Sequence, residues 1–115
     1  MVRSSQPSPA EAASTTCIFC QIIARKLPAF VLTEDDDYMV WLALESHPLI
    51  VPKKHIANIF ELPDQLTSSV MRITKRISIA TKAALGADGI TITQTNGAAA
   101  GQSVFHYHVH VYPRW

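Results

Sequence analysis

In the stretch Phe105-His106-Tyr107-His108-Val109-His110-Val111-Tyr112, histidine alternates with aromatic and β-branched residues. This two-residue period is typical of a half-buried β-strand. Because side chains alternate between the two faces of a strand, we expect all three imidazoles on one face, about 6.6 Å apart along the strand. The other face carries Phe105, Tyr107, Val109 and Val111, which are suited to a core. A slip of one residue would bury three imidazoles, so the pattern also specifies the register.

Three aligned imidazoles are suited to chemistry at a phosphate. Near neutral pH, histidine acts as a nucleophile, a proton shuttle or a metal ligand. An imidazole that attacks phosphorus forms a phosphoramidate, which divides one difficult displacement into two easier ones. The neighbouring rings can orient that nucleophile and donate hydrogen bonds to phosphate oxygens. The alternatives are a solvated polar face and a three-histidine metal site, although residues two apart on one strand converge poorly on one ion.

The loop before this strand favours the phosphate hypothesis. It reads Asn96-Gly97-Ala98-Ala99-Ala100-Gly101-Gln102-Ser103, a run of small residues punctuated by glycine. Such a loop can aim backbone N–H groups at an anion. Glycine loops are common, so this one carries weight only beside the histidines.

The rest of the pattern predicts an α+β domain with an antiparallel sheet, because strands, a long helix and further strands follow one another. The long helix is expected over residues 63–85, with Pro63 in its first turn and Gly86 at its end. Its apolar side consists of Leu66, Val70, Ile73, Ile77 and Ala84. One later strand alternates, with Ile90 and Ile92 on its buried side. A short helix is expected over 18–25, and strands over 29–33, 38–44, 49–52, 88–95 and 104–112.

Composition limits the range of partners. Hydrophobic residues make up 48% and charged residues 17% of the 115 residues, which is typical of one globular domain. A net charge of +1 provides no basic field for nucleic acid, and no apolar run approaches the ~20 residues of a membrane span. Two cysteines without a secretory signal predict a reducing compartment, the cytoplasm. Residues 1–16, rich in Ser, Pro and Ala, are expected to form a flexible tail.

Taken together, these features resemble the histidine triad (HIT) family, whose signature is His-φ-His-φ-His-φ-φ, with φ hydrophobic. The signature stands here at residues 106–112, and the resemblance extends over residues 17–115. It includes Cys17-Ile18-Phe19-Cys20 and Pro52-Lys53-Lys54-His55. The resemblance implies a HIT domain over 17–115, with a HIT-like fold of one five-stranded antiparallel sheet, one long helix and one short helix. It also implies a homodimer in which two such sheets join.

The resemblance further implies an enzyme that acts on purine nucleotides. His108 matches the nucleophile that attacks the α-phosphate, after which water hydrolyses the nucleotidyl-histidine. His106 and His110 flank it and support the phosphate site or the orientation of the nucleophile. His47 matches a histidine that lies near the phosphate pocket. The other positions assigned to the nucleotide and phosphate site are Asn96, Gly101, Gln102 and Ser103.

The same resemblance implies a structural zinc ion and no organic cofactor. In many members a Cys-x-x-Cys pair binds zinc together with two histidines, and these positions correspond here to Cys17, Cys20, His55 and His106. Two thiolates and two imidazoles make a common tetrahedral zinc site. The alternative is a pair of small thiols buried in the core.

The sequence departs from the family between the second and third predicted strands. The stretch Trp41-Leu42-Ala43-Leu44-Glu45-Ser46-His47-Pro48 is shorter than in family members. Ala43 stands where an aspartate normally binds the ribose, and Glu45 is the nearby side chain that can replace it. The ribose pocket is therefore the part of the site that this sequence changes most.

The resemblance therefore implies a hydrolase of purine nucleoside phosphoramidates or related nucleotide conjugates. One alternative is a dinucleotide polyphosphate hydrolase or a nucleotidyl transferase, because side chains outside the triad select the leaving group. Another is a non-catalytic nucleotide-binding or scaffold protein with an impaired ribose pocket. Covalent labelling of the protein by a nucleotide separates the enzymes from the scaffold.

Overall fold

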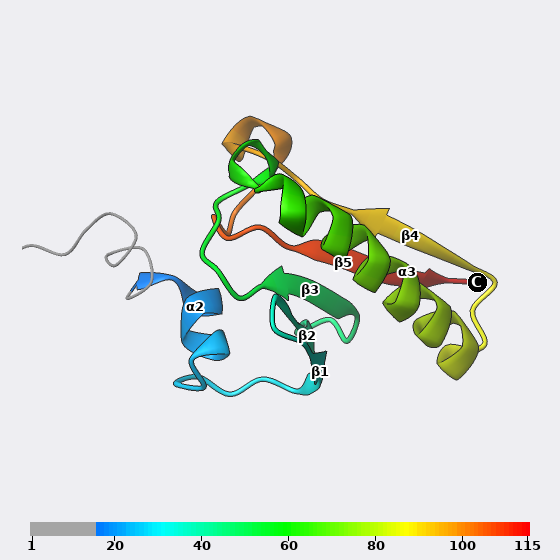
Figure 1. Cartoon of the computed structure of the whole chain (residues 1–115). Helices are drawn as coiled ribbons and strands as arrows, with labels where there is room; N and C mark the ends of the chain where they lie inside the picture. The colour runs from blue at the N-terminus through cyan, green and yellow to red at the C-terminus, as the bar shows by residue number, and fades with distance from the viewer. Residues whose placement is uncertain (1–15) are drawn as a thin grey trace, which may run out of the picture.

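Five strands form a single antiparallel sheet in the computed structural model, which describes residues 16–115 (Figure 1). The order of strands across the sheet is β1-β2-β3-β5-β4, so β5 lies between β3 and β4. The predicted α+β architecture, with a five-stranded antiparallel sheet, one long helix and one short helix, is confirmed. The elements are α2 (Ile18–Ile23), β1 (Val31–Glu34), β2 (Tyr38–Leu42), β3 (Pro48–Pro52), α3 (Asp64–Leu85), β4 (Gly89–Thr93) and β5 (Val109–Arg114), with short 3-10 helices at Ile59–Glu61 and Ala98–Ala100.

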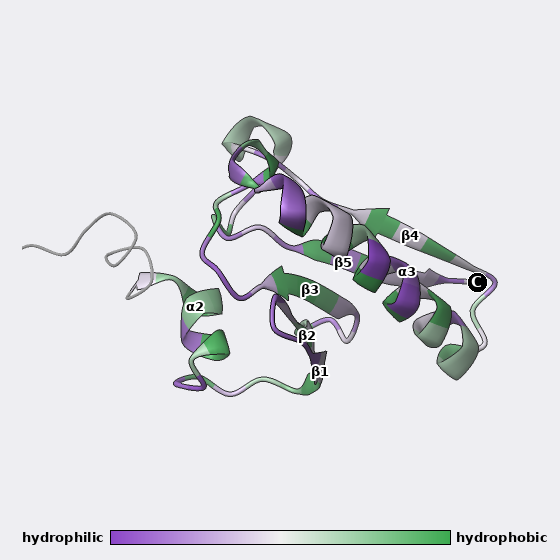
Figure 2. Ribbon diagram, viewed as in Figure 1, coloured by the Kyte–Doolittle hydropathy of each residue, from purple (hydrophilic) through white to green (hydrophobic). Residues whose placement is uncertain are grey.

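The two faces of the sheet are covered by different elements. The long helix α3 lies across one face (Figure 1). Its apolar side packs there on Tyr38, Val40 and Val111. On the other face, Met39 and Trp41 pack against residues of α2. Strands β2 and β3 are therefore buried on both sides, which explains why their sequences are almost continuously apolar (Figure 2).

The boundaries of α3 follow the predicted signals closely. Pro63 precedes the helix as its N-cap instead of lying in its first turn, and Gly86 ends it with a left-handed φ of 61°. The predicted apolar side is confirmed for Val70, which is buried, and for Leu66, Ile73 and Ile77, which pack against the core. The prediction was wrong for Ala84, because the last turn of the helix is exposed on all sides.

The last strand begins later than predicted. β5 starts at Val109, whereas the expected strand covered 104–112. The residues before it follow an irregular path, because the Tyr107 N–H donates to the Ile56 carbonyl oxygen at 2.6 Å instead of joining the sheet ladder. As a result Phe105 is 47% exposed and does not belong to the core, contrary to prediction, while Tyr107, Val109 and Val111 are buried as expected.

Strand β4 forms one edge of the sheet and is less buried than predicted. Ile90 packs against the α3-side core, but Ile92 remains 50% exposed at this edge. The predicted tail, residues 1–16, lies outside the described residues except for Thr16. Between residues 16 and 115, no helix combines the length and apolar character that crossing a bilayer requires.

Candidate functional site

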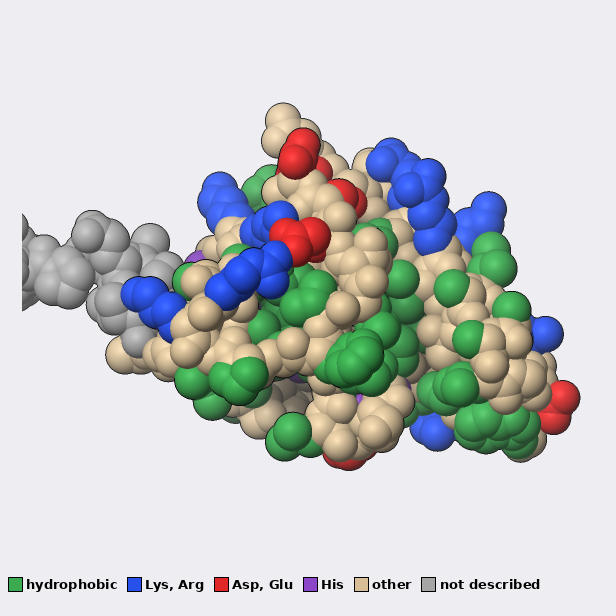
Figure 3. Space-filling model, turned by 90° about the horizontal axis from the view of Figure 1, so that it is seen from below, with side chains coloured by type: hydrophobic (Ala, Val, Ile, Leu, Met, Phe, Trp, Pro, Cys, Tyr) green, Lys and Arg blue, Asp and Glu red, His purple; other side chains and the backbone are tan. Residues whose placement is uncertain are grey.

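A cavity of about 830 Å³ opens on the sheet face that α3 leaves uncovered. Its lining includes His108, His110 and Ser103, which come from β5 and the loop before it. The walls are mainly apolar, and Figure 3 shows apolar side chains gathered on this side with small parts of histidine visible between them. The wall residues are Ile18, Phe19, Ile22, Phe30, Trp41, Leu42 and Leu44. No sequence pattern predicts these walls, because their side chains come from segments far apart in the chain.

The hydrogen bonding of His108 is suited to a nucleophile. Its Nδ1–H donates to the backbone carbonyl of His106 at 2.7 Å, which leaves an electron pair on Nε2. Burial lowers the pKa of His108 below its ordinary value, although the bond to His106 opposes that shift. The ring therefore stays neutral, with an unprotonated Nε2, at pH values near 7.

His110 and His47 form a pair beside His108, and the ring centroids of His108 and His110 are 4.9 Å apart. Nε2 of His47 lies 2.8 Å from Nδ1 of His110, so one ring donates a hydrogen bond to the other. Burial, followed by the nearby imidazoles of His108 and His47, lowers the pKa of His110 to about 4. Burial likewise lowers the pKa of His47, which is only 3% exposed. Tyr112 stacks on His110 with ring centroids 5.4 Å apart and completes the pair's packing.

The predicted phosphate residues of the preceding loop fall into two groups. Ser103 lines the cavity with His108 and His110. Gln102 is buried and braces the loop: its side-chain oxygen accepts from Gly97, and its amide donates to the carbonyls of residues 57 and 104. Asn96 likewise joins the loop to the Ile59 N–H and to residue 94. Gly101 has a φ of 93° where the loop leaves its 3-10 turn, a conformation that favours glycine.

The shortened β2–β3 connection is a tight hairpin turn at the rim of the cavity. The Ala43 carbonyl accepts from the Ser46 N–H and the Ala43 N–H donates to the His47 carbonyl, both at 2.8 Å. Ser46 has a left-handed φ of 68°, as a three-residue hairpin loop requires. Within the described part of the chain, Glu45 is the only carboxylate that lines the cavity.

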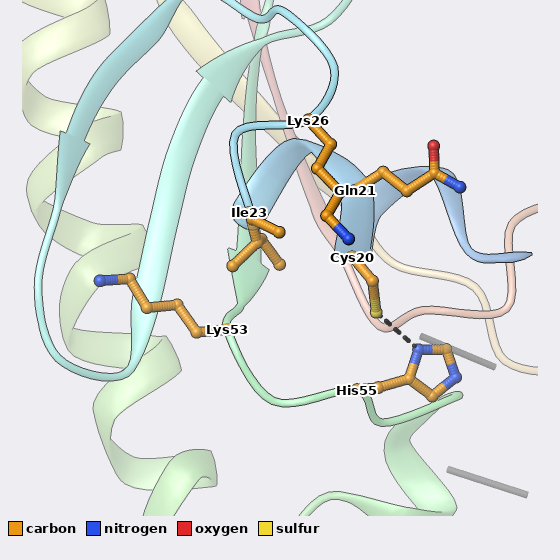
Figure 4. Close-up of a pocket in the computed structure, with 7 residues that line it drawn as sticks. Cys20, Gln21, Ile23, Lys26, Lys53 and His55 are labelled. Atoms are coloured by element: carbon orange, nitrogen blue, oxygen red, sulfur yellow. Dashed lines mark hydrogen bonds between the residues drawn. The ribbon is translucent and has the colours of Figure 1, made fainter. Parts of the chain in front are cut away.

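The four predicted zinc ligands converge beside this cavity. The donor atoms of Cys17, Cys20, His55 and His106 all lie within 4.8 Å of one another. Nδ1 of His55 is 3.2 Å from the Cys20 sulfur (Figure 4), and Nδ1 of His106 is 3.4 Å from the Cys17 sulfur. Nε2–H of His106 donates to the Pro52 carbonyl at 2.8 Å, which leaves Nδ1 unprotonated and facing the cysteines.

This donor set fits zinc. Two thiolates and two neutral imidazoles suit a tetrahedral site, and a carbonyl behind a ligating histidine is the usual outer partner. Burial lowers the pKa of His106 to about 4, so its ring is neutral, as a metal ligand must be. Since His106 is completely buried and both its ring nitrogens are engaged, its side chain does not face the cavity.

An α+β domain with aligned histidines on its uncovered sheet face defines the class of protein, and comparison defines the family. The model of the HIT domain matches residues 24–115, so the chain belongs to the histidine triad family. Protein hit of Bacillus subtilis is 37% identical over 103 residues, which cover 86% of this chain and 71% of that protein.

Two further relatives bear on the metal and the chemistry. The crystal structure of a zinc-bound histidine triad family protein from Mycobacterium smegmatis matches with a TM-score of 0.84 and 34% identity, covering 89% of this chain and 77% of that one. Adenylylsulfatase HINT3 of Arabidopsis thaliana is 37% identical over 102 residues, which cover 85% of this chain and 52% of that protein.

Proposed function

We propose that the protein is a nucleotide hydrolase that attacks the α-phosphate of purine nucleoside phosphoramidates or related nucleotide conjugates. The observation that carries this proposal is the state of His108, whose Nδ1–H is bound to a backbone carbonyl while the ring lines the cavity. Membership of a family of nucleotide-binding hydrolases and transferases, one of them named an adenylylsulfatase, supports the same chemistry.

The reaction proceeds in two displacements at the same phosphorus. The electron pair of His108 Nε2 forms a P–N bond, while the bond from phosphorus to the leaving amine breaks and that amine takes up a proton from solvent. Water then attacks the nucleotidyl-histidine, which releases the nucleotide, restores the free imidazole and returns a proton to solvent. Formation of the covalent intermediate makes the mechanism directly testable.

The His47–His110 pair supports the phosphate in this scheme. If Nδ1 of His110 accepts from Nε2–H of His47, then Nε2–H of His110 points a hydrogen bond toward a phosphate oxygen. We assign this tautomer because a donor placed where negative charge develops lowers the barrier. The hydroxyl of Ser103 supplies a second donor on the same lining.

The remainder of the cavity accommodates the nucleoside. Ile18 and Ile22 of α2, together with Phe30, offer an apolar surface for a purine base. Glu45, the carboxylate of that lining, is placed to accept hydrogen bonds from ribose hydroxyls. With Ala43 at the position that an aspartate fills in family members, the contact to the ribose is the weaker part of this site.

The assembly follows from the edge of the sheet. Strand β4 lies at one end of the strand order, and Ile92 beside its edge is half exposed. Pairing of two such edges satisfies their backbone groups and covers this side chain, so we propose a homodimer. A structural zinc ion and a cytoplasmic location, without nucleic-acid or membrane partners or an organic cofactor, complete the proposal.

The decisive experiment is covalent trapping. The protein is incubated with adenosine 5′-phosphoramidate labelled at the phosphorus and is then quenched in alkaline detergent, which preserves the P–N bond of the nucleotidyl-histidine. We expect labelled wild-type protein and unlabelled His108→Ala. Binding of AMP without labelling would instead indicate the nucleotide-binding scaffold. A panel of adenylates and dinucleotide polyphosphates with the same readout then separates phosphoramidase, dinucleotide hydrolase and transferase activity.

A further inference from the structure

The metal cluster and the nucleophile share one residue. The ring of His106 faces Cys17 and Cys20, while its backbone carbonyl accepts the Nδ1–H of His108 at 2.7 Å. Ring and carbonyl belong to the same residue, so a rotation of the peptide that follows His106 changes the bond that selects the tautomer of His108. His106 thus touches the cluster with its side chain and the nucleophile with its main chain.

A second link runs through α2. Phe19 lies between the two cysteines in the sequence and packs edge-on against His108, with ring centroids 5.1 Å apart and an interplanar angle of 86°. The same ring lies 5.9 Å from His106 and 5.3 Å from Trp41, and it is 8% exposed. A side chain held on both flanks by cluster residues therefore forms the wall against which the nucleophile rests.

We propose that Phe19 and the His106 carbonyl are positioning groups that couple the cluster of Cys17, Cys20, His55 and His106 to the orientation of His108. Filling the cluster fixes α2 against the segment that precedes β5. The two contacts then hold the imidazole of His108 in its Nδ1–H form, with Nε2 available to the cavity. The inference rests on the proposed function only where it names His108 as the nucleophile. Zinc loading thus determines the fraction of molecules in which His108 is correctly oriented, in addition to stabilising the fold.

The cluster is open to solvent on one side, which makes this coupling accessible to experiment. Cys20 and His55 line a pocket of about 350 Å³ together with Lys26 and Lys53 (Figure 4). This pocket lies apart from the lining that contains His108. A chelator can therefore reach the cluster without occupying the nucleotide cavity.

The test combines zinc removal with a variant that leaves all four ligands in place. Phe19→Leu keeps an apolar side chain on α2 but removes the ring edge against His108. We expect zinc content near that of the wild type, a KM within about twofold, and a kcat lower by about threefold to tenfold, the range that one edge-to-face ring contact supports. The matched control is Val70→Ala, which removes core volume on the α3 face and is expected to lower Tm but not kcat.

The second readout does not depend on turnover. Long-range 1H–15N spectra of the histidine rings report the tautomer of His108 directly. We expect a single Nδ1–H form in the zinc-loaded wild type, and a mixture of tautomers both after chelation and in Phe19→Leu, with zinc restoring the first only. Unchanged His108 nitrogens in both samples would overturn the coupling, as would a kcat loss in Val70→Ala equal to that in Phe19→Leu. If the wild type hydrolyses no nucleotide, the proposed function fails, but these spectra still decide the coupling.

Discussion

The two faces of the sheet are held by different kinds of contact. Under α3, the core consists of apolar side chains such as Val40, Ile50 and Val70, and these pack by non-directional apolar contacts. On the opposite face, an apolar cluster under α2 is accompanied by specific hydrogen bonds that hold the rings of His106, His108 and His110. A substitution under α3 should therefore change stability and leave the chemistry intact, whereas one on the histidine face should change the chemistry.

The strongest test of this contrast is a substitution of His108, the proposed nucleophile. We expect His108→Ala to lose about a thousandfold or more in kcat, because removing a covalent nucleophile removes the pathway. Nucleotide binding should persist in His108→Asn, which retains a polar side chain. Steady-state kinetics and equilibrium titration with AMP measure the two effects. Retention of more than about a tenth of the activity by His108→Ala would contradict the mechanism.

Zinc removal tests whether the metal cluster on the histidine face also contributes to stability. We expect about one zinc per chain by elemental analysis, from the single cluster in the described residues. At free zinc about 100-fold above its Kd, loading contributes about 2.7 kcal/mol, so chelation should lower Tm by about 10 °C or more. Cys20→Ser is the matched variant, since it removes one thiolate. An absence of zinc together with unchanged melting after chelation would favour two buried thiols.

The histidines beside the cavity should become protonated at a lower pH than free imidazoles do. Burial lowers the pKa of His108, so Nε2 stays unprotonated where a free imidazole of pKa about 6.5 is charged. We therefore expect the acidic limb of kcat/KM to be centred below about pH 6.5. Burial lowers the pKa of His110 to about 4, and its contribution to the free energy of unfolding is complete above about pH 6.5 and lost as the pH falls toward 4. An acidic limb centred at or above pH 6.5 would argue against a buried neutral nucleophile.

A polar contact on the α3 face should behave like the apolar ones around it. The Tyr38 hydroxyl donates to the Leu66 carbonyl at 2.6 Å, and burial raises the pKa of Tyr38 to about 12. Tyr38→Phe should lower the free energy of unfolding by about 1 kcal/mol and leave kcat and KM unchanged. Denaturant titration and kinetics on the same preparation measure both. If the loss of kcat, expressed as an activation free energy, exceeded the loss in the free energy of unfolding, the two faces would not differ in the way described.

The smallest expected effect concerns the ribose. Since the side chain of Ala43 offers no acceptor and Glu45 lies on an exposed turn, we expect only a slight preference for adenylate over deoxyadenylate substrates, expressed in KM. Glu45→Ala should abolish that preference, whereas Glu61→Ala, an exposed carboxylate outside the cavity lining, should not. A strong ribose preference that survives Glu45→Ala would show that another group binds the diol.

Local periodicity explains which parts of the fold were predictable. The 3.6-residue pattern of α3 and the apolar runs of β2 and β3 lie within single elements, so neighbours in the sequence are enough to reveal them. The same holds for the alternation at Val109 and Val111. It failed at Phe105, Ile92 and Ala84, where an irregular backbone, a sheet edge and a helix end leave an apolar position without a partner.

Sequence alone determined the aligned histidines, the Cys-x-x-Cys pair and the family, because these are patterns of residue types at short spacing. Only the tertiary structure decided that His47 pairs with His110, that Gln102 braces its loop, and that α2 brings Phe19 against His108. Each of those contacts joins segments whose approach depends on strand order, on a backbone conformation or on the direction of a side chain. A site of this kind is assembled by topology, so its residue types can be recognised in the sequence while its geometry depends on the packed fold.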